Sequence, residues 1–591
     1  MGLARSVAQR THLGGLLRHC GKKRDAPGEA SLSPGRPIIG YNIVLAAPDA
    51  TGFKLAENNT PKILGIYIGR DAAMKMIAQI SNTTKPKALA TKLNALKAFA
   101  HSGDKRASLA LQLLVSCAAP SVNYALRGCR PADTNGMATL ADSMLIDAFA
   151  AICNIEPEEL SPDSRALAHI RISQKAGGFG LPSMVTLAKT AYLASWAAAG
   201  GRICSRWKHL EADMNALDRM HTDMPPTYEY AKCLFTQRRY CCSTLGLEDM
   251  ISKELSFTQQ ISKGDIVYPS ANATETWQRR FGAAEAALAK AAIANSVAQQ
   301  TGTLEQPQAL ALQAWHKSLE SEGRAAFLHC MPNIWTEPLT NPQFEFAVRR
   351  LLRSKLRNVE GTICACGATL DGYGDHADSC PTLIGMRNKR HDLVNTEGIG
   401  APAKQAGLSP TFETQGLVED TNGRPADTCI RTLHGFGKDV TACYDCVGVG
   451  TCASTYVQAA ARWQGGAMQA AVNRKLRNAR RLRGTVDLVV IPMAFESQGG
   501  LHSNWRTTYL EWAKLWGSRS VAERPRWRQS LMVLSWIART SLVIQREQYT
   551  LVHYMVTCAN RRSHGDVRHA HRAPASDDFD NALAAMPPLE A

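Results

Sequence analysis

The sequence has few of the features that define membrane, secreted or disulfide-rich proteins. It has no uninterrupted apolar run of the ~18 residues that a membrane-spanning helix needs, and the stretch Leu531–Ile544 is broken by Arg539. The basic N-terminus lacks the apolar region of a secretory signal. The 17 cysteines are too sparse for a disulfide scaffold in 591 residues. We therefore expect no membrane or secretory segment, and reduced thiols with metal ligands among them.

Acidic residues are also in short supply. The chain has 51 Asp and Glu residues against 68 Lys and Arg residues, a formal net charge of +17. A chain this basic usually meets a polyanion, and nucleic acid is the first candidate; general solubility is the alternative explanation. The 45% of hydrophobic and 20% of charged residues are an ordinary globular balance. The length suggests three or four structural units.

Apolar periodicity divides the chain into a helical part and a mixed part. From Asp71 to about Phe149 apolar residues recur at three- and four-residue spacing, and helical patterns with proline interruptions continue to about residue 340. We expect helical N-terminal and middle regions followed by an α/β region. The predicted divisions are an irregular segment 1–60, helical regions 61–200 and 201–340, a basic helix with a cysteine–histidine cluster 341–395, an α/β domain 396–530, a C-terminal helix 531–560 and a disordered tail 561–591.

A cluster of soft metal ligands occupies one glycine-rich segment. Its members are Cys364, Cys366, His376 and Cys380, with Gly367, Gly372 and Gly374 between them. Zinc favours tetrahedral sulfur and nitrogen ligands on short loops, so the spacing predicts a small structural zinc knuckle; a chance grouping of thiols is the alternative. Cys443 and Cys446, with Cys429 and Cys452 nearby, are candidates for a second metal site, although their strand context favours buried thiols.

Basic residues flank the cysteine cluster on both sides. Arg350, Arg353 and Arg357 lie on one face of the predicted helix before it, at a spacing suited to phosphates. A solvated basic face is the alternative. Arg390 and His391 open the helix after the cluster, and a core or phosphate-contact role is favoured over catalysis for His391.

A pair of acidic residues and a later lysine form the second motif. Asp427 and Asp439 begin two predicted strands of a β-hairpin whose turn contains Gly435 and Gly437. Two carboxylates brought together can hold Mg²⁺. A predicted helix from Thr455 to about Arg481 carries Lys475, which could position water or stabilise charge, and a strand Thr485–Ser497 brings Glu496 as a reserve ligand or base. The basic residues expected to hold a DNA backbone are Arg462, Arg474, Arg477, Arg480 and Arg481.

These residues together resemble the C-terminal half of non-LTR retrotransposon polyproteins that carry a restriction-like endonuclease. The order is the same: a Cys-Cys-His-Cys cluster, an Arg-His pair, a Pro–Asp element, a second Asp and a helical lysine. Upstream, Leu64–Gly69, Tyr124–Arg127, Gly177–Leu181 and Ala191–Ser195 resemble the reverse transcriptase thumb and linker. The resemblance implies a nuclear endonuclease with zinc and Mg²⁺. It would nick target duplex DNA for target-primed reverse transcription, with element RNA as a further partner.

The sequence departs from that family in three ways. Ala426 separates Pro425 from Asp427, and Asp439 lacks a lysine two residues later, so the lysine role goes to Lys475 with Lys438 as a fallback. No aromatic-x-Asp-Asp element precedes Leu64, so the polymerase palm is missing. We expect no reverse transcriptase activity from this chain alone. The alternative function is a nucleic-acid-binding retroelement remnant with an inactive nuclease.

Overall fold

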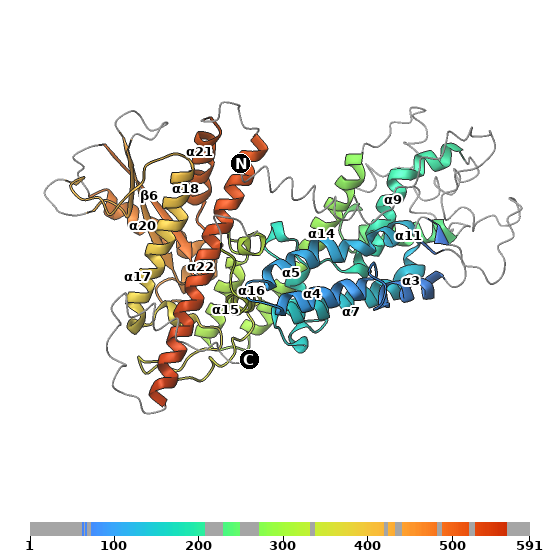
Figure 1. The fold of residues 1–591 in the computed structure, drawn as a ribbon, viewed down its shortest axis with the longest axis horizontal. Helices are drawn as coiled ribbons and strands as arrows, with labels where there is room; N and C mark the ends of the chain where they lie inside the picture. The colour runs from blue at the N-terminus through green and yellow to red at the C-terminus, as the bar shows by residue number, and fades with distance from the viewer. Residues whose placement is uncertain are drawn as a thin grey trace, which may run out of the picture. The chain divides into compact units, whose positions relative to one another are not determined.

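Helices make up most of the structure before residue 360, and the larger sheet lies in the C-terminal half (Figure 1). The computed structural model describes residues 62–63, 66–67, 72–206, 229–248, 271–330, 337–418, 424–431, 440–481, 487–518 and 526–563. All of them belong to one unit, Leu55–Ala591. The predicted segment 1–60 and nearly all of the predicted tail 561–591 lie outside these residues. The expectation of a helical region followed by an α/β region is confirmed.

The N-terminal helices bury one apolar face each. In α7 (Pro131–Cys153), Leu145, Phe149 and Ile152 recur at helical spacing and are buried. A short antiparallel pair, β1 (Lys62–Ile63) and β2 (Ile66–Tyr67), precedes the helices. The others in this part are α3 (Ala72–Ser81), α4 (Leu89–His101), α5 (Ala107–Leu113), α6 (Asn123–Gly128), α8 (Arg165–Arg171), α9 (Met184–Arg206), α11 (Glu229–Ser243), α14 (Ala271–Thr301), α15 (Gln306–Ser318) and α16 (Asn341–Leu352).

The glycine-rich segment between α8 and α9 is a tight turn, as the sequence predicts. Gly177 (φ +91°) and Gly180 (φ +77°) adopt left-handed conformations that favour glycine. Between them Phe179 is buried, and its ring packs edge-on against Phe149 with centroids 5.2 Å apart. The turn therefore serves the helical core.

Two apolar segments, Ala107–Gly128 and Pro131–Cys153, are long and apolar enough to cross a membrane by length and composition. The expectation of no membrane segment rests on uninterrupted apolar runs, and polar residues interrupt both segments. Both segments supply buried side chains to the helical core, among them Leu111, Leu126 and Leu145. Core helices pass the same test, so it is weak evidence for a membrane span.

The larger sheet has four strands in the order β3-β4-β5-β6. The strands are β3 (Thr411–Phe412), β4 (Thr428–Arg431), β5 (Thr441–Val449) and β6 (Leu488–Glu496). The pairs β3–β4 and β4–β5 are antiparallel, so β4 and β5 form the predicted hairpin, whereas β5 and β6 are parallel over nine residue pairs. A parallel pair needs a crossover connection, which α19 (Val457–Arg462) and α20 (Gly466–Ala479) provide. The predicted single helix is thus interrupted at Gly465, where φ is +68°.

Helices cover both faces of this sheet, which explains why β5 is almost entirely buried. On one face, Val447, Val449 and Ala494 pack against α19 and α20. On the other, Tyr444, Met493 and Phe495 pack against α21 (Ser503–Ser518) and α22 (Arg526–Ser563). The remaining C-terminal helices are α17 (Ile384–Leu393) and α18 (Ala401–Gln405), joined by the π-helical segment η9 (Val394–Gly400).

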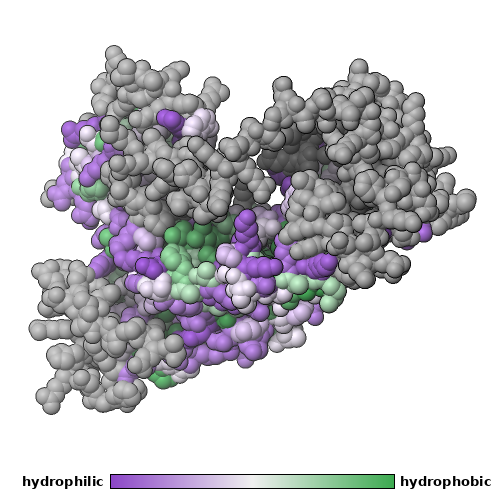
Figure 2. All heavy atoms as spheres, turned by 45° about the vertical axis from the view of Figure 1, so that its right-hand side comes forward, coloured by the Kyte–Doolittle hydropathy of each residue, from purple (hydrophilic) through white to green (hydrophobic). Residues whose placement is uncertain are grey.

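The 38-residue helix α22 links three cores. Its first half packs with the sheet through Trp536 and Ile537, and Leu542 joins the helical core. Further along, Val552 and Met555 pack against the cysteine-rich segment. Most of the described surface in Figure 2 is hydrophilic, interrupted by an apolar area, as expected for a charged chain whose apolar residues fill these cores.

Candidate active site and metal centre

Two carboxylates meet at the start of β4. The antiparallel register pairs Arg431 with Thr441, Cys429 with Cys443 and Thr428 with Tyr444. The next pair in this series is Asp427 and Asp445. Asp445 is buried in the middle of β5, and Asp427 lies one residue before β4. The structure therefore pairs Asp427 with Asp445, whereas the sequence suggested Asp439 as the second carboxylate.

Asp427 is held by two donors. Its Oδ2 accepts a hydrogen bond from the backbone N–H of Cys446 at 2.7 Å. The same oxygen lies 3.1 Å from Nε2 of His391 on α17, and this nitrogen also lies 3.1 Å from the carbonyl oxygen of Cys446. Nδ1 of His391 lies 3.1 Å from Asp392. Both ring nitrogens of His391 thus face acceptors, as in a protonated imidazole.

Asp445 is held by the lysine that the sequence singles out. Nζ of Lys475, on α20, donates to Oδ1 of Asp445 at 2.8 Å. This contact is possible because the crossover folds α20 back over the face of β5 that presents Asp445. The structure therefore brings together His391, Asp427, Asp445 and Lys475 from four different elements.

The charges of this group perturb one another. Burial alone lowers the pKa of His391, but the hydrogen bond and the charge of Asp427 raise it to about 9. Burial favours a higher pKa for Asp427, which His391 more than offsets, so the pKa of Asp427 is lowered. Burial raises the pKa of Asp445, Lys475 opposes this, and the neighbouring Asp427 carboxylate raises it further. Two close carboxylates with opposing pKa shifts are typical of functional sites.

The two other predicted acids lie elsewhere. Asp439 and the fallback Lys438 fall in 432–439, outside the described residues. Glu496 is buried at the far end of β6, opposite Val449 and four positions beyond the partner of Asp445. Burial raises the pKa of Glu496 to about 7, which the charge of Arg324 opposes. Glu496, the predicted reserve ligand or base, therefore does not join Asp427, Asp445 and Lys475.

The acidic pair has the donor chemistry of a site for a hard cation. Oδ2 of Asp427 and the carbonyl oxygen of Cys446 converge on one N–H of His391, so these oxygens already surround a positive charge. The Asp445 carboxylate, opposite Asp427, could supply a third oxygen. Asp427 retains 24% side-chain exposure, so the pair is partly open to solvent.

The predicted cysteine–histidine cluster also comes together. The ligand atoms of Cys364, Cys366, His376 and Cys380 all lie within 4.8 Å of one another. The Cys364 and Cys380 sulfurs are 3.5 Å apart, and the Cys366 sulfur is 3.2 Å from Nε2 of His376. Ligands of a tetrahedral zinc at ~2.0–2.3 Å are about 3.3–3.8 Å apart. Burial lowers the pKa of His376, which favours the neutral imidazole that a metal binds. This cluster could therefore hold a metal such as zinc.

The turns that form this cluster are fixed locally. Gly367 (φ +90°) closes the turn after Cys364, and Gly374 (φ +72°) precedes the 3₁₀ turn η7 (Asp375–Asp378) that carries His376. The Asp371 carboxylate accepts the backbone N–H groups of Tyr373, Asp375 and His376 at 2.8–3.1 Å. Cys380 follows this turn, and its backbone N–H donates to the carbonyl of His376 at 2.9 Å.

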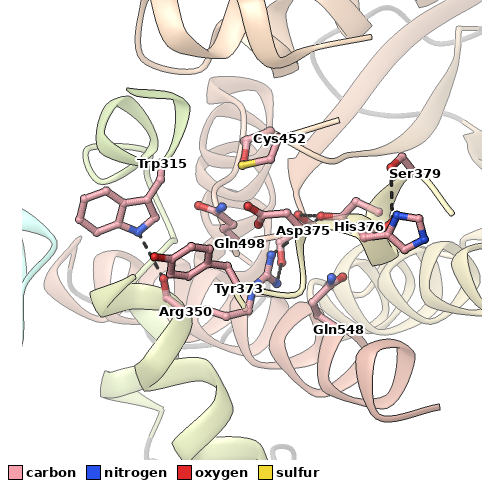
Figure 3. A network of polar contacts seen from close by, with 12 residues as sticks. Trp315, Arg350, Tyr373, Asp375, His376, Ser379, Cys452, Gln498 and Gln548 are labelled. Atoms are coloured by element: carbon pink, nitrogen blue, oxygen red, sulfur yellow. Dashed lines mark hydrogen bonds and ion pairs between the residues drawn. The ribbon is translucent and has the colours of Figure 1, made fainter. Parts of the chain in front are cut away.

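A buried polar network joins this segment to the sheet (Figure 3). Asp375 pairs with Arg353 at 2.7 Å, and Asp378 pairs with Arg390 at 3.0 Å. The other Asp378 oxygen accepts from Ser497, directly after β6, at 2.5 Å. Arg350 donates to the carbonyl of Ser497 at 3.1 Å, while its own carbonyl accepts from Trp315. Arg390 immediately precedes His391, so this network also fixes the helix that carries His391.

The predicted nucleic-acid contacts separate into two groups. Arg350, Arg353 and Arg390 are buried, and Arg357 pairs with Glu156 and Glu345, which corrects their expected role as phosphate contacts. The second group is exposed in the structure and surrounds Lys475 in the sequence: Arg462, Arg474, Arg477, Arg480 and Arg481.

Sequence reasoning missed Asp445. A carboxylate in the middle of the buried run TACYDCVGV was a usable signal, because an acid in a central strand needs a partner.

No protein-family model matches the chain, and no curated protein matches it.

Proposed function

We propose that this chain is a metal-dependent endonuclease that nicks duplex DNA at a site built on Asp427 and Asp445. The observation that carries the proposal is the juxtaposition of these two carboxylates with Lys475 and His391. Phosphodiester hydrolysis needs an activated water and a positive charge near the developing phosphorane. In this cluster the two carboxylates could hold the metal that activates the water, and Lys475 and His391 supply the positive charge.

Each residue has a distinct role in this proposal. Asp427, Asp445 and the Cys446 carbonyl would hold Mg²⁺, which polarises the phosphoryl group and lowers the pKa of an attacking water. Lys475 stays beside Asp445 and faces the negative charge that develops on the phosphate. His391, whose Nε2 lies 3.1 Å from Asp427 Oδ2, would supply a proton to the leaving oxygen.

The exposed arginines on and directly after α20 would hold the DNA backbone next to these groups. Arg474 and Arg477 belong to the helix that also carries Lys475, and Arg480 follows its last residue. Backbone contacts of this kind position a duplex without reading its sequence. The cysteine–histidine cluster would be a zinc knuckle that braces α17 through Asp378 and Arg390.

Together with the ordered motifs of the sequence, this site supports a role as the endonuclease part of a non-LTR retrotransposon. The chain would nick a target before target-primed reverse transcription, in the nucleus, with element RNA as a further partner. The helical region would correspond to a thumb and linker. No reverse transcriptase activity is expected from this chain alone.

The test is a nicking assay with the full chain loaded with zinc. Supercoiled plasmid and a pool of random-sequence duplexes are incubated with and without Mg²⁺, and open-circular product is measured. Asp427→Asn should lower nicking by about 10²–10³-fold while DNA binding, measured by fluorescence anisotropy, stays intact. Asp487→Asn, at an exposed position, is the matched control. Equal nicking by Asp427→Asn would refute the assignment. DNA binding without nicking by any variant would favour the retroelement remnant with an inactive nuclease.

A further inference from the structure

Two buried thiols lie beside the acidic pair in the same two strands. Cys429 on β4 and Cys443 on β5 are direct cross-strand partners. Their sulfur atoms are 3.3 Å apart, and both side chains are buried with Leu417 and Ala426. We propose that Cys429 and Cys443 form a reversible disulfide, a modification site directly adjacent to Asp427 and Asp445.

The strand geometry places the thiols and the acids on one face. Side chains two positions apart along a strand point to the same side of the sheet. Cys429 is two residues after Asp427, and Cys443 is two residues before Asp445. The two thiols are therefore the next cross-strand pair on that face after the two carboxylates.

A disulfide fits this pair better than a metal does. The other cysteines of the suggested second cluster point elsewhere: Cys446 faces the opposite side of β5, in the same core as Tyr444, and Cys452 contacts the carbonyl of Ala311 at 3.7 Å. Among the described residues, three or more soft ligands converge only at Cys364, Cys366, His376 and Cys380. A pair of thiols without further ligands is a poor zinc site, which needs four donors.

The geometry needs little change for the bond to form. Sulfurs in a disulfide are ~2.05 Å apart, so each side chain moves by less than an ångström from the present 3.3 Å separation. Antiparallel cross-strand partners have Cα atoms about 4.5–5.5 Å apart, which lies in the range that disulfides span.

Hydrogen peroxide is the oxidant of the proposed reaction. One thiol sulfur attacks a peroxide oxygen, the O–O bond breaks, and a sulfenic acid and one water form. The second sulfur then attacks the sulfenic sulfur, the S–S bond forms, and a second water carries away the remaining thiol proton. Two thiols lose two electrons and one peroxide gains them. Both thiols are buried, so peroxide, a small molecule, would reach them when the four-residue strand β4 opens locally.

The disulfide would fasten β4 to β5. Strand β4 has only four residues, and the two-residue β3 is its other neighbour. Since β4 leads directly from Asp427, the cross-link would restrict opening of the acidic pair. Its effect on metal binding rests on the proposed function, whereas the disulfide itself does not.

Peptide mapping of the native, zinc-loaded full chain tests the proposal. The protein is treated with limited peroxide, free thiols are alkylated, and the chain is digested with trypsin. Arg431 and Lys438 lie between the two cysteines, so their peptides separate unless a disulfide joins them. We expect the joined pair, lower in mass by two hydrogen atoms, at a peroxide dose that leaves buried Cys153 reduced, and its reversal by dithiothreitol. Amide hydrogen exchange of β4 should slow by about tenfold or more on oxidation.

Two controls make the outcome specific. Cys443→Ala should give no joined pair and should leave Cys429 as a sulfenic acid that dimedone traps, whereas Cys446→Ala should keep the disulfide. The proposal is overturned if Cys429 and Cys443 both stay free at a dose that fully oxidises exposed Cys117, or if they join other cysteines instead. Neither result depends on nuclease activity, so failure here is distinct from failure of the proposed function.

Discussion

Asp427 and Asp445 face each other across the antiparallel strands β4 and β5, as the next pair after Thr428 and Tyr444. Each carboxylate has a cation of its own, since His391 contacts Asp427 and Lys475 contacts Asp445. Because each carboxylate contacts a cation, the two negative charges can lie close together at a modest cost in free energy.

We predict that Asp445 is essential for nicking and that Asp439 is dispensable. Asp445→Asn should lower the nicking rate by about 10²–10³-fold, because it removes a metal ligand and the partner of Lys475. Asp439→Asn should stay within about threefold of the unmodified chain, since the strand register gives the position opposite Asp427 to Asp445. Single-turnover nicking and Mn²⁺ binding by calorimetry measure both variants. The opposite ranking would restore the pair suggested by sequence alone.

The sequence was sufficient to predict the strands and the helix around this site. It was insufficient to predict the register between β4 and β5. Strand patterns on either side of Gly435 and Gly437 predicted the β4–β5 hairpin, and the basic run predicted the helix that carries Lys475. The residue opposite Asp427 depends on how many residues the turn contains, and a shift in register changes every cross-strand partner. Asp445 lies in a run that otherwise reads as buried core, so its polarity was the one local clue.

The buried arginines show a second limit of sequence reasoning. Arg350 and Arg353 have the spacing of an exposed basic face, yet their acidic partners Asp378 and Asp375 lie beyond a chain reversal. An ion pair between distant residues cannot be read from local spacing. The cysteine–histidine cluster was predictable because all four of its residues fall within one short segment.

We predict that the exposed arginines on and directly after α20 supply salt-dependent DNA affinity. Replacing all four by glutamine should flatten the slope of log affinity against log salt by about 0.9 for each DNA phosphate that an arginine no longer neutralises. Anisotropy titrations over a salt series measure the slope. A control with the same reduction in charge uses exposed lysines outside α20 and should keep the slope. The four test positions are Arg474, Arg477, Arg480 and Arg481, and the four control positions are Lys85, Lys87, Lys317 and Lys514.

If both sets lower the slope equally, net charge rather than the α20 surface would account for binding. The effects of single substitutions of the four arginines on the salt slope can then be compared. Arg474, whose guanidinium lies 5.8 Å from the Tyr456 ring centroid, should have a smaller effect than Arg477, because the interaction with the ring restrains it.

We predict that the cysteine–histidine cluster binds one zinc ion and that the ion stabilises the fold. Mass spectrometry under native conditions should find about one zinc per chain, and Cys364→Ser with Cys380→Ser should abolish it. A ligand that binds only the folded state adds about 2.7 kcal/mol to the free energy of unfolding at 100 times its Kd. Chemical denaturation with and without a chelator measures this difference. Cys117→Ser, at an exposed position, is the control, and unchanged zinc content in the double variant would remove the claim.

The last prediction concerns the helical core and the pH dependence of stability. Burial raises the pKa of Glu285, on α14, from 4.5 to about 7, although the nearby Thr190 hydroxyl lowers it in part. Between these two values the folded state holds a proton that the unfolded chain has released. The contribution of Glu285 to the free energy of unfolding therefore falls as pH rises from about 4.5 to about 7, and it stays level above that range.

Glu285→Gln should remove this part of the pH dependence while keeping an oxygen for Thr190. Above pH 7 the variant should be more stable than the unmodified chain by about 2 kcal/mol, because it no longer ionises a buried carboxyl. Urea unfolding at a series of pH values from 4.5 to 8 measures the difference, with Glu305→Gln as the exposed control. Parallel stability curves for Glu285→Gln and the unmodified chain would show that the Glu285 carboxyl is solvated in the folded state, since a solvated carboxyl has nearly the same pKa in the folded and unfolded states.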